Sequence, residues 1–286
     1  MKRLLCLILS LILVFSMAAC GGDSSIGKSS FGGSLGVSQK IRFTKSVTQS
    51  QIDAVISGRD SMNALCESAP QQSQIGADSC YDMVKLIAEG LGVSSSEISS
   101  IQSKKDSMSL SADSAVQEQV NSTYRTVELL LLIAEKLDKK SEYSTDLTSI
   151  ELTFATQNSK ASSAPQQLVN GLYRCVDILE VIAKIADTKD KYSSDITLIT
   201  TRLITQDNSC SSAPQQSVNG SYRAVEMILL IAEILDSGSD FTVDISRVST
   251  QLSVQNESCE SAPQQNVNGV YRMVEAFGVM AEVLNS

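Results

Sequence analysis

The sequence predicts an all-α protein built from tandem two-helix repeats of about 49 residues, arranged as a solenoid or as a closed helical bundle. The first observation is a recurring segment, Ser-Ala-Pro-Gln-Gln, which begins at residues 68, 163, 212 and 261 and is degenerate at Ser114. The second is a Tyr-Arg pair ten residues after the start in four copies. The third is the spacing of apolar residues by three and four, which marks helices. Aligned copies at a nearly fixed period are the signature of repeat architecture.

Residues 1–19 have the layout of a secretory signal peptide. Lys2 and Arg3 precede an apolar stretch that runs from Leu4 to Val14, and small residues then lead to Cys20. The apolar stretch is too short for a transmembrane helix of ordinary length. We therefore expect residues 1–19 to be removed from the mature protein.

The segment Met17-Ala18-Ala19-Cys20 resembles the lipobox of bacterial lipoprotein precursors. That family usually has Leu where this chain has Met17, and the resemblance covers only the signal-peptide region. It implies cleavage between Ala19 and Cys20, a diacylglycerol on the Cys20 sulfur, and a fatty acid such as palmitate on the new amine. It also implies a lipid-anchored cell-envelope protein, and Gly21 implies the outer membrane in a Gram-negative cell. The alternative is an ordinary signal peptide with a chance cysteine.

Residues 20–47 contain the lipidated cysteine and a Gly/Ser-rich tether. Residues 22–29 match the P-loop pattern G-x-x-x-x-G-K-[ST]. A working P-loop lies between a strand and a helix, and neither is expected here, so we predict no nucleotide site. The helical repeat domain occupies residues 48–286 and contains five two-helix units, at roughly 48–92, 97–138, 144–187, 193–236 and 242–286.

The longer helix of each unit begins at the Ser-Ala-Pro-Gln-Gln segment and runs for about 24 residues. Its serine is the expected N-cap, and the first glutamine is the N3 residue of a capping box. The proline lies in the first turn, where a helix tolerates it. Gly171, Gly220 and Gly269 each follow an asparagine inside this helix and mark a potential break or kink.

The shorter helix of each unit follows a polar loop and has an aspartate in its first turn. In the fourth unit, Asp195 precedes Ile196, Ile199 and Leu203, which are spaced three and four apart. The threonine-rich run 196–201 is also compatible with a strand, but the spacing shared between copies favours a helix. We expect N-caps at Ser144, Ser193 and Thr242, and aromatic plugs of the hairpin ends at Tyr143, Tyr192 and Phe241.

A helical wheel places a row of polar residues of the longer helix opposite its apolar face. In stacked repeats, this row becomes a ladder of amide, phenol and carboxylate groups that suits a peptide, a glycan or a neighbouring protein. The alternative, which we favour, is packing, in which the Gln and Asn side chains satisfy helix ends and the Tyr-Arg pairs meet acids of the adjacent repeat. The candidate binding face consists of Asn121, Tyr124, Arg125, Asn170, Tyr173, Arg174, Asn219, Tyr222, Arg223, Asn268, Tyr271 and Arg272.

Five cysteines lie in the repeats, and Cys66, Cys210 and Cys259 share one repeat position that alanine fills in the other copies. Such a swap indicates small packed residues, although an oxidising envelope permits disulfides. A continuous helix holds Cys66 and Cys80 roughly 20 Å apart, too far for a disulfide. A Cys66–Cys80 disulfide therefore requires the helix to restart near residues 76–79.

Composition excludes several function classes. The chain contains no His, which is the commonest general base and zinc ligand, and no C-x-x-C pair, so we expect no metal and no cofactor. The formal net charge of −9 argues against nucleic-acid binding, which needs a basic face.

We therefore expect a lipid-anchored envelope protein that is not an enzyme and that acts as a binding or structural module. Its contact with the membrane is the N-terminal lipid, and its partner is an unidentified protein or glycan. Two alternatives remain open. One is an envelope hydrolase that uses paired carboxylates, and the other is a surface-displayed adhesin or effector.

Overall fold

The structure is a computed structural model that describes residues 41–286. Within these residues the chain forms ten α-helices, alternately short and long. The short helices are α2 (Gln49–Asn63), α4 (Ser95–Ser109), α6 (Ser144–Lys160), α8 (Ser193–Asp207) and α10 (Thr242–Ser258). The long helices are α3 (Ala69–Leu91), α5 (Ala115–Leu137), α7 (Ala164–Ala186), α9 (Ala213–Leu235) and α11 (Ala262–Asn285). The predicted signal peptide and Cys20 lie outside the described residues.

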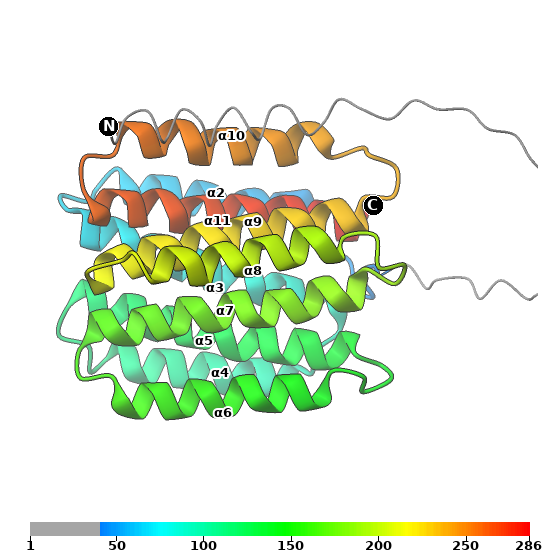
Figure 1. Ribbon diagram of the computed structural model, residues 1–286, viewed down its shortest axis with the longest axis horizontal. Helices are drawn as coiled ribbons and strands as arrows, with labels where there is room; N and C mark the ends of the chain where they lie inside the picture. The colour runs from blue at the N-terminus through cyan, green and yellow to red at the C-terminus, as the bar shows by residue number, and fades with distance from the viewer. Residues whose placement is uncertain (1–40) are drawn as a thin grey trace, which may run out of the picture. The chain divides into compact units, whose positions relative to one another are not determined.

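The five long helices form a closed inner ring. α3 packs against α5, α5 against α7, α7 against α9, α9 against α11, and α11 returns to α3. Each short helix lies outside the ring against the long helix that follows it, and α2 contacts both α3 and α11 where the ring closes (Figure 1). The predicted all-α two-helix repeats are confirmed, and of the two predicted arrangements the structure has the closed bundle.

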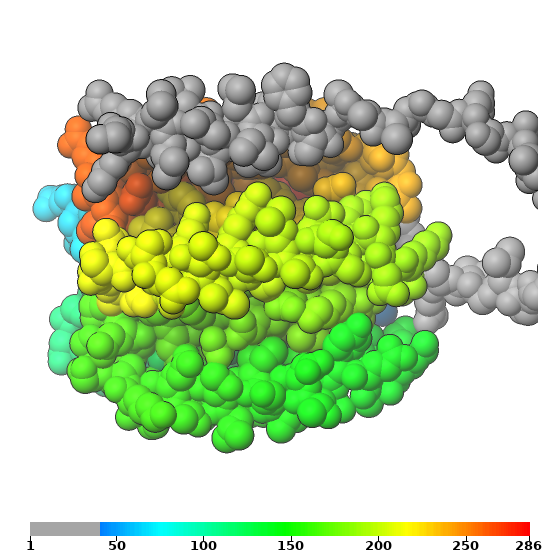
Figure 2. Space-filling view, viewed as in Figure 1, coloured from blue at the N-terminus to red at the C-terminus, as the bar shows by residue number. Residues whose placement is uncertain are grey.

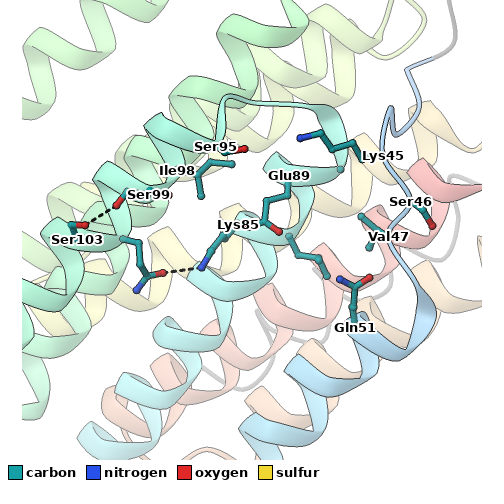
Figure 3. Close-up of a pocket in the computed structure, with 13 residues that line it drawn as sticks. Lys45, Ser46, Val47, Gln51, Lys85, Glu89, Ser95, Ile98, Ser99 and Ser103 are labelled. Atoms are coloured by element: carbon teal, nitrogen blue, oxygen red, sulfur yellow. Dashed lines mark hydrogen bonds between the residues drawn. The ribbon is translucent and has the colours of Figure 1, made fainter.

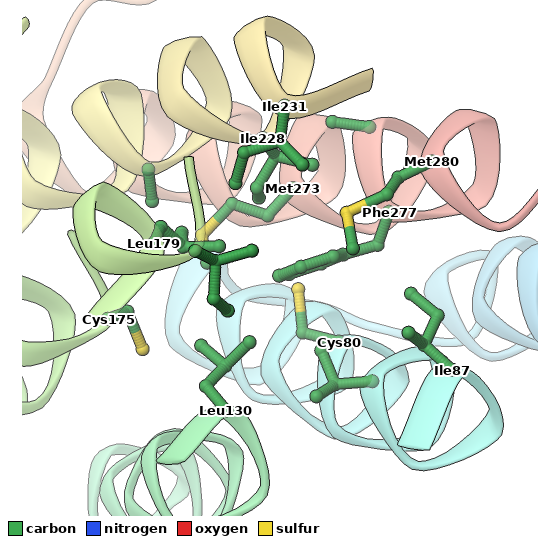
Figure 4. Packing of buried hydrophobic residues seen from close by; sticks show 14 of the residues in the cluster. Cys80, Ile87, Leu130, Cys175, Leu179, Ile228, Ile231, Met273, Phe277 and Met280 are labelled. Atoms are coloured by element: carbon green, nitrogen blue, oxygen red, sulfur yellow. The ribbon is translucent and has the colours of Figure 1, made fainter. Parts of the chain in front are cut away.

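The centre of the ring is filled by apolar side chains. Cys80, Leu130, Leu179, Ile228 and Phe277 are buried there, and each comes from a different long helix (Figure 4). Full burial of one such Leu, Ile or Phe side chain contributes roughly 1.5–3 kcal/mol. Because a single two-helix unit cannot bury its own apolar face, this shared core joins the five units into one body.

The short helices bury far fewer residues than the long ones. α6 has one buried residue, Leu147, and α10 has two, Val248 and Leu252. In Figure 2, α6 (green) and α8 (yellow-green to yellow) lie outermost as separate ridges, with other side chains closing the surface between them. The short helices therefore serve as an outer layer whose single apolar stripe rests on the ring.

The N-termini of the long helices follow the prediction only in part. Each has its serine at the N-cap, but only the Ser114 side chain accepts a hydrogen bond from the N3 backbone, at 3.3 Å. The glutamine reaches back as expected but accepts from the residue before the N-cap, as Gln166 Oε1 does from Ser162 N at 2.9 Å. The segment therefore ties down the loop before the helix rather than forming a complete capping box.

The loops from long to short helices contain a capping device that the sequence reading missed. Asp187, the C-cap residue that follows α7, accepts hydrogen bonds from Lys191 N at 3.0 Å and Tyr192 N at 2.7 Å. Asp138 and Asp236 make the same pair of bonds one unit before and one unit after. The predicted N-caps were each one residue late: the caps are Tyr143, Tyr192 and Phe241, not Ser144, Ser193 and Thr242.

The helical glycines permit close approach and do not break the helices. α7, α9 and α11 run uninterrupted through Gly171, Gly220 and Gly269, so the predicted break is absent. A Cβ atom on Gly220 would lie 2.9 Å from Leu172 Cβ and 3.0 Å from Tyr173 Cδ1 of the preceding long helix. Only glycine therefore lets neighbouring long helices approach this closely without a shift.

Residues 41–47 belong to the folded body, although the sequence reading assigned them to the tether. Phe43 N donates to Leu284 O at 3.0 Å, and Thr44 N donates to Gly90 O at 2.8 Å. Val47 is buried, and a Cβ atom on Gly90 would meet its side chain and the Phe43 ring. The described chain thus begins at the end of the ring where the long helices finish.

Candidate functional site

The tyrosines of the predicted binding face join neighbouring units. Each hydroxyl donates to a side chain in the last turn of the short helix that follows it, as Tyr124 does to Asn158 Oδ1 at 2.7 Å. Tyr173 donates to Asp207 at 2.6 Å, and Tyr222 donates to Asn256 at 2.8 Å. At the closure, Tyr271 of the last long helix makes the same contact with Asn63 of the first short helix, at 2.6 Å. The closing interface is therefore built like the others.

The asparagines of the same set fix each short helix to its long helix. Asn219 Nδ2 donates to Leu203 O at 2.9 Å, and Asn268 Nδ2 donates to Leu252 O at 3.0 Å. Asn268 Nδ2 also lies 3.1 Å from the Tyr222 hydroxyl of the preceding unit. One amide thus links a long helix, its short helix and the neighbouring unit. Asn121 and Asn170 make the equivalent bonds to their short helices.

The arginines pair with acids three residues later in the same helix. Arg223 lies 2.7 Å from Glu226, and Arg174 lies 3.0 Å from Asp177. Arg125 and Arg272 form the same pairs, with Glu128 and Glu275. These four acids are the carboxylates of the predicted polar row, and each is held in an ion pair.

The candidate binding face is therefore a set of packing contacts and does not present a free surface. Nine of the twelve residues are buried, and the other three, Tyr173, Arg174 and Tyr222, are half-buried. The helical wheel predicted exposure for these residues because it considers one helix alone. In the structure each long helix contacts two neighbouring long helices and two short helices, which cover its polar side as well. The twelve residues that the prediction placed on a binding face, and that the structure places in packing contacts, are Asn121, Tyr124, Arg125, Asn170, Tyr173, Arg174, Asn219, Tyr222, Arg223, Asn268, Tyr271 and Arg272.

Burial raises the pKa of two of the paired acids, Glu226 and Asp177. Burial raises the pKa of Asp177 to about 6, and the neighbouring Arg174 opposes this rise. A raised pKa can mark a general acid, but structural ion pairs shift pKa values as well. The closest acid along the chain, Glu180, lies on the same helix and pairs with Lys184 at 2.6 Å. Asp177 and Glu180 therefore do not face each other across two helices, as a hydrolytic carboxylate pair would.

The cysteines in the described repeats are all free thiols. α3 is continuous from Ala69 to Leu91, so the helix restart required for a Cys66–Cys80 disulfide does not occur. Cys80 is buried against α11, with its sulfur 3.6 Å from Val270 O. Burial raises the pKa of the Cys80 and Cys175 thiols, which disfavours the reactive thiolate.

A polar pocket of about 540 Å³ lies where the first unit departs from the repeat. It opens between α2 and α4 over α3 and is drawn in Figure 3. Lys85 projects from α3 into this region, and its Nζ donates to Gln102 Oε1 at 3.0 Å. The lining comprises Lys45, Ser46, Val47, Gln51, Lys85, Leu86, Glu89, Gly90, Ser95, Ile98, Ser99, Gln102 and Ser103.

Differences from the other units explain why the pocket is there and why it is polar. Lys85 occupies the position of Leu131 in α5 and Leu229 in α9, counted from the start of each repeat. The flanking short helices have small N-cap residues, Thr48 and Ser94. The remaining short helices have aromatic N-caps that pack against the core: Tyr143, Tyr192 and Phe241. The other two long helices have Glu180 and Gly278 at this position, so the side chain there varies between units. An aromatic ring, by contrast, is present at each of the three remaining short-helix starts, and two such rings are missing around this opening.

The sequence reading did not identify this pocket. A signal was present, because the interval between the first two repeat starts is 46 residues rather than 49. The shorter connection ends α3 at Gly92, in the left-handed conformation, and contains neither the capping aspartate nor the aromatic residue of the other loops. The first unit therefore differs from the other units both in the length of its loop and in the polarity of its residues, and these two differences coincide with the pocket.

Over residues 41–286, no cluster of three or more His, Cys, Asp or Glu side chains could hold a metal ion. In the same residues, no helix combines the length and apolar character needed to cross a membrane. Comparison of the chain with protein families, curated proteins and solved structures finds no match.

Proposed function

We propose that this chain is a lipid-anchored cell-envelope protein whose helical ring acts as a binding or structural module without enzymatic activity. The observation that carries the proposal is the order of the sequence: a signal-peptide pattern, a lipobox-like Met17–Cys20 and a Gly/Ser-rich tether precede the repeats. The folded body begins by Ile41. About 20 tether residues give a root-mean-square reach of about 25 Å, which holds such a body near a membrane surface.

The non-enzymatic part of the proposal is supported by where the acids lie. Glu128, Asp177, Glu226 and Glu275 each pair with an arginine of the same helix. The lining of the polar pocket includes one carboxylate, Glu89. A hydrolase with paired carboxylates needs two acids across one cleft, so it has less support. A surface-displayed adhesin or effector differs from the proposal only in which side of the membrane the ring faces.

Mass spectrometry of the protein purified from its native membrane tests the anchor. We expect the N-terminal peptide to begin at Cys20 and to have the added mass of a diacylglycerol, with a further acyl chain on the amine. Two or more acyl chains give stable anchoring, whereas one is marginal. A Cys20→Ala variant controls for other membrane contacts and should leave the membrane fraction. An intact signal peptide or an unmodified Cys20 would overturn the anchor.

A further inference from the structure

The first unit provides a lysine that the packing of the ring does not require. Lys85 is half-buried, and its ammonium has three donors, of which one is used on Gln102. Among the described residues, Lys45, Lys85 and Glu89 form no ion pair within 4.0 Å. By contrast, the four arginines of the inner helices are all paired. Two ammonium groups and one carboxylate, that of Glu89, therefore share this opening, and the balance of one positive charge favours an anion over a cation.

The rest of the lining is rich in hydroxyl and amide groups. Ser95, Ser99 and Ser103 are four residues apart and share one face of α4, which lines the pocket. Gln51 adds an amide from α2, and Gln102 is held in place by the Tyr81 hydroxyl at 3.0 Å. Only three lining residues carry large apolar side chains: Val47, Leu86 and Ile98. Such a lining suits a polyhydroxylated ligand and does not suit an acyl chain.

We propose that this pocket binds a small anionic sugar. Its carboxylate or phosphate lies by Lys45 and Lys85, and its hydroxyls bond the Ser95 and Ser99 hydroxyls of α4 and the Gln51 amide nitrogen. Gln102 and Ser103 shape the wall, because their side chains already bond Asp106 and the Ser99 carbonyl oxygen. The volume of about 540 Å³ is within the usual range for small-molecule sites. The acidic chain, with a formal net charge of −9, repels anions in general, so local lysines are needed to select one. This inference rests on the proposed function, because it gives the binding module its ligand.

Isothermal titration calorimetry of residues 41–286, which contain the whole core, tests the proposal with glucuronate, glucose 6-phosphate and glucose. We expect at least one of the two anions to bind and neutral glucose to bind at least about tenfold more weakly, because charge-assisted hydrogen bonds are the stronger kind. The two anions distinguish a carboxylate ligand from a phosphate ligand.

A repeat-based variant separates the site from the fold. Lys85→Leu installs the residue found at the equivalent positions 131 and 229, so the ring should remain folded with an unchanged melting temperature. We expect at least a tenfold loss of anion affinity. Lys140→Leu removes the same charge from a side chain that is 81% exposed, outside the pocket, and should leave the affinity unchanged. Absence of binding by both anions, or equal losses in the two variants, would overturn the proposal. Neither outcome affects the lipid anchor, which the mass measurement decides.

Discussion

Four of the five contacts around the ring are built from a tyrosine and a glycine, and the fifth is not. Tyr173 faces Gly220 of the next long helix, and a Cβ atom there would lie within 3.1 Å of the ring. The equivalent pairs are Tyr124 with Gly171, Tyr222 with Gly269, and Tyr271 with Gly76. Between α3 and α5 the pair is Asp78 and Ser122, joined by a hydrogen bond from the serine hydroxyl. The tyrosine and the glycine are therefore replaced together.

This difference shows that two repeat positions in contact with each other, the tyrosine on one helix and the glycine on the next, are replaced together. A tyrosine ring on one helix requires the missing Cβ on the next, whereas the smaller Asp78 side chain is next to a serine and accepts its hydrogen bond. Lys105 of α4 then lies 2.8 Å from Asp78 and supplies the positive charge at this interface. The same first unit also contains Lys85 and the shortened loop. Closure of the ring thus tolerates one divergent contact, and α3, which supplies Asp78 to that contact, also lines the polar pocket.

Among substitutions at the tyrosine–glycine contacts and at the divergent contact, removal of a tyrosine ring should lower the free energy of unfolding most. Tyr222→Ala leaves a cavity between units and removes the bond to Asn256, so the free energy of unfolding should fall by about 3 kcal/mol. Tyr173→Ala and Tyr271→Ala should behave alike, and the triple variant should approach the whole stability of an ordinary domain. Chemical denaturation followed by circular dichroism measures each loss.

The matched control is Asp78→Ala, at the same repeat position in the divergent contact. It removes an ion pair and a hydrogen bond at a half-buried site, and we expect a loss of about 1 kcal/mol. If the tyrosine variants melted like the unaltered protein, the tyrosines would be surface groups, and the ladder would return as a candidate binding face.

The second-largest effect is expected from an alanine at the glycine of a tyrosine–glycine contact, compared with an alanine at the serine of the divergent contact. Alanine normally stabilises a helix relative to glycine by about 1 kcal/mol. At Gly220 the added Cβ meets Leu172 and the Tyr173 ring, so Gly220→Ala should instead destabilise by about 2 kcal/mol. Ser122→Ala keeps the Cβ that the divergent contact already accommodates and removes only the hydroxyl oxygen. It should lose only the bond to Asp78, about 1 kcal/mol. A Gly220→Ala protein that melts higher would show that the helices can separate freely.

The sequence was sufficient to predict which segments are helices and that each unit begins with its short helix, because both depend on the spacing of apolar residues within one copy. In α8, for example, Ile196, Ile199 and Leu203 are spaced three and four apart, and all three are buried. Ring closure could not be predicted, because it depends on the rotation between successive units, which no single copy encodes. The polar face was misread for the same reason: Tyr222 is satisfied by Asn256, which is 34 residues away. The capping aspartates were detectable, since Asp138, Asp187 and Asp236 are 49 residues apart.

The loops offer the smallest effect and a further contrast between the repeated units and the first. Asp187 is buried and caps two backbone N–H groups of the loop before α8. Asp187→Ala leaves both donors to water, so the free energy of unfolding should fall by about 1–2 kcal/mol, as for the loss of a helix N-cap. Asp187→Asn retains one acceptor oxygen and should give an intermediate value. Thermal unfolding is a sufficient measurement, since 1 kcal/mol corresponds to roughly 2–4 °C for a body of this size.

In the first unit the equivalent loop begins at Gly92, the C-cap of α3, and ends at Ser94, the N-cap of α4, which has no side-chain bond to the backbone. The Ser94 hydroxyl instead shares a hydrogen bond with the Ser96 hydroxyl at 2.7 Å. Ser94→Ala should therefore change the free energy of unfolding by less than about 0.5 kcal/mol, as exposed substitutions usually do. Equal losses for Asp187→Ala and Ser94→Ala would mean that the aspartate bonds add nothing to the loop. In that case the shortened loop would be equivalent to the others in stability, and its difference would lie only in the pocket that it opens.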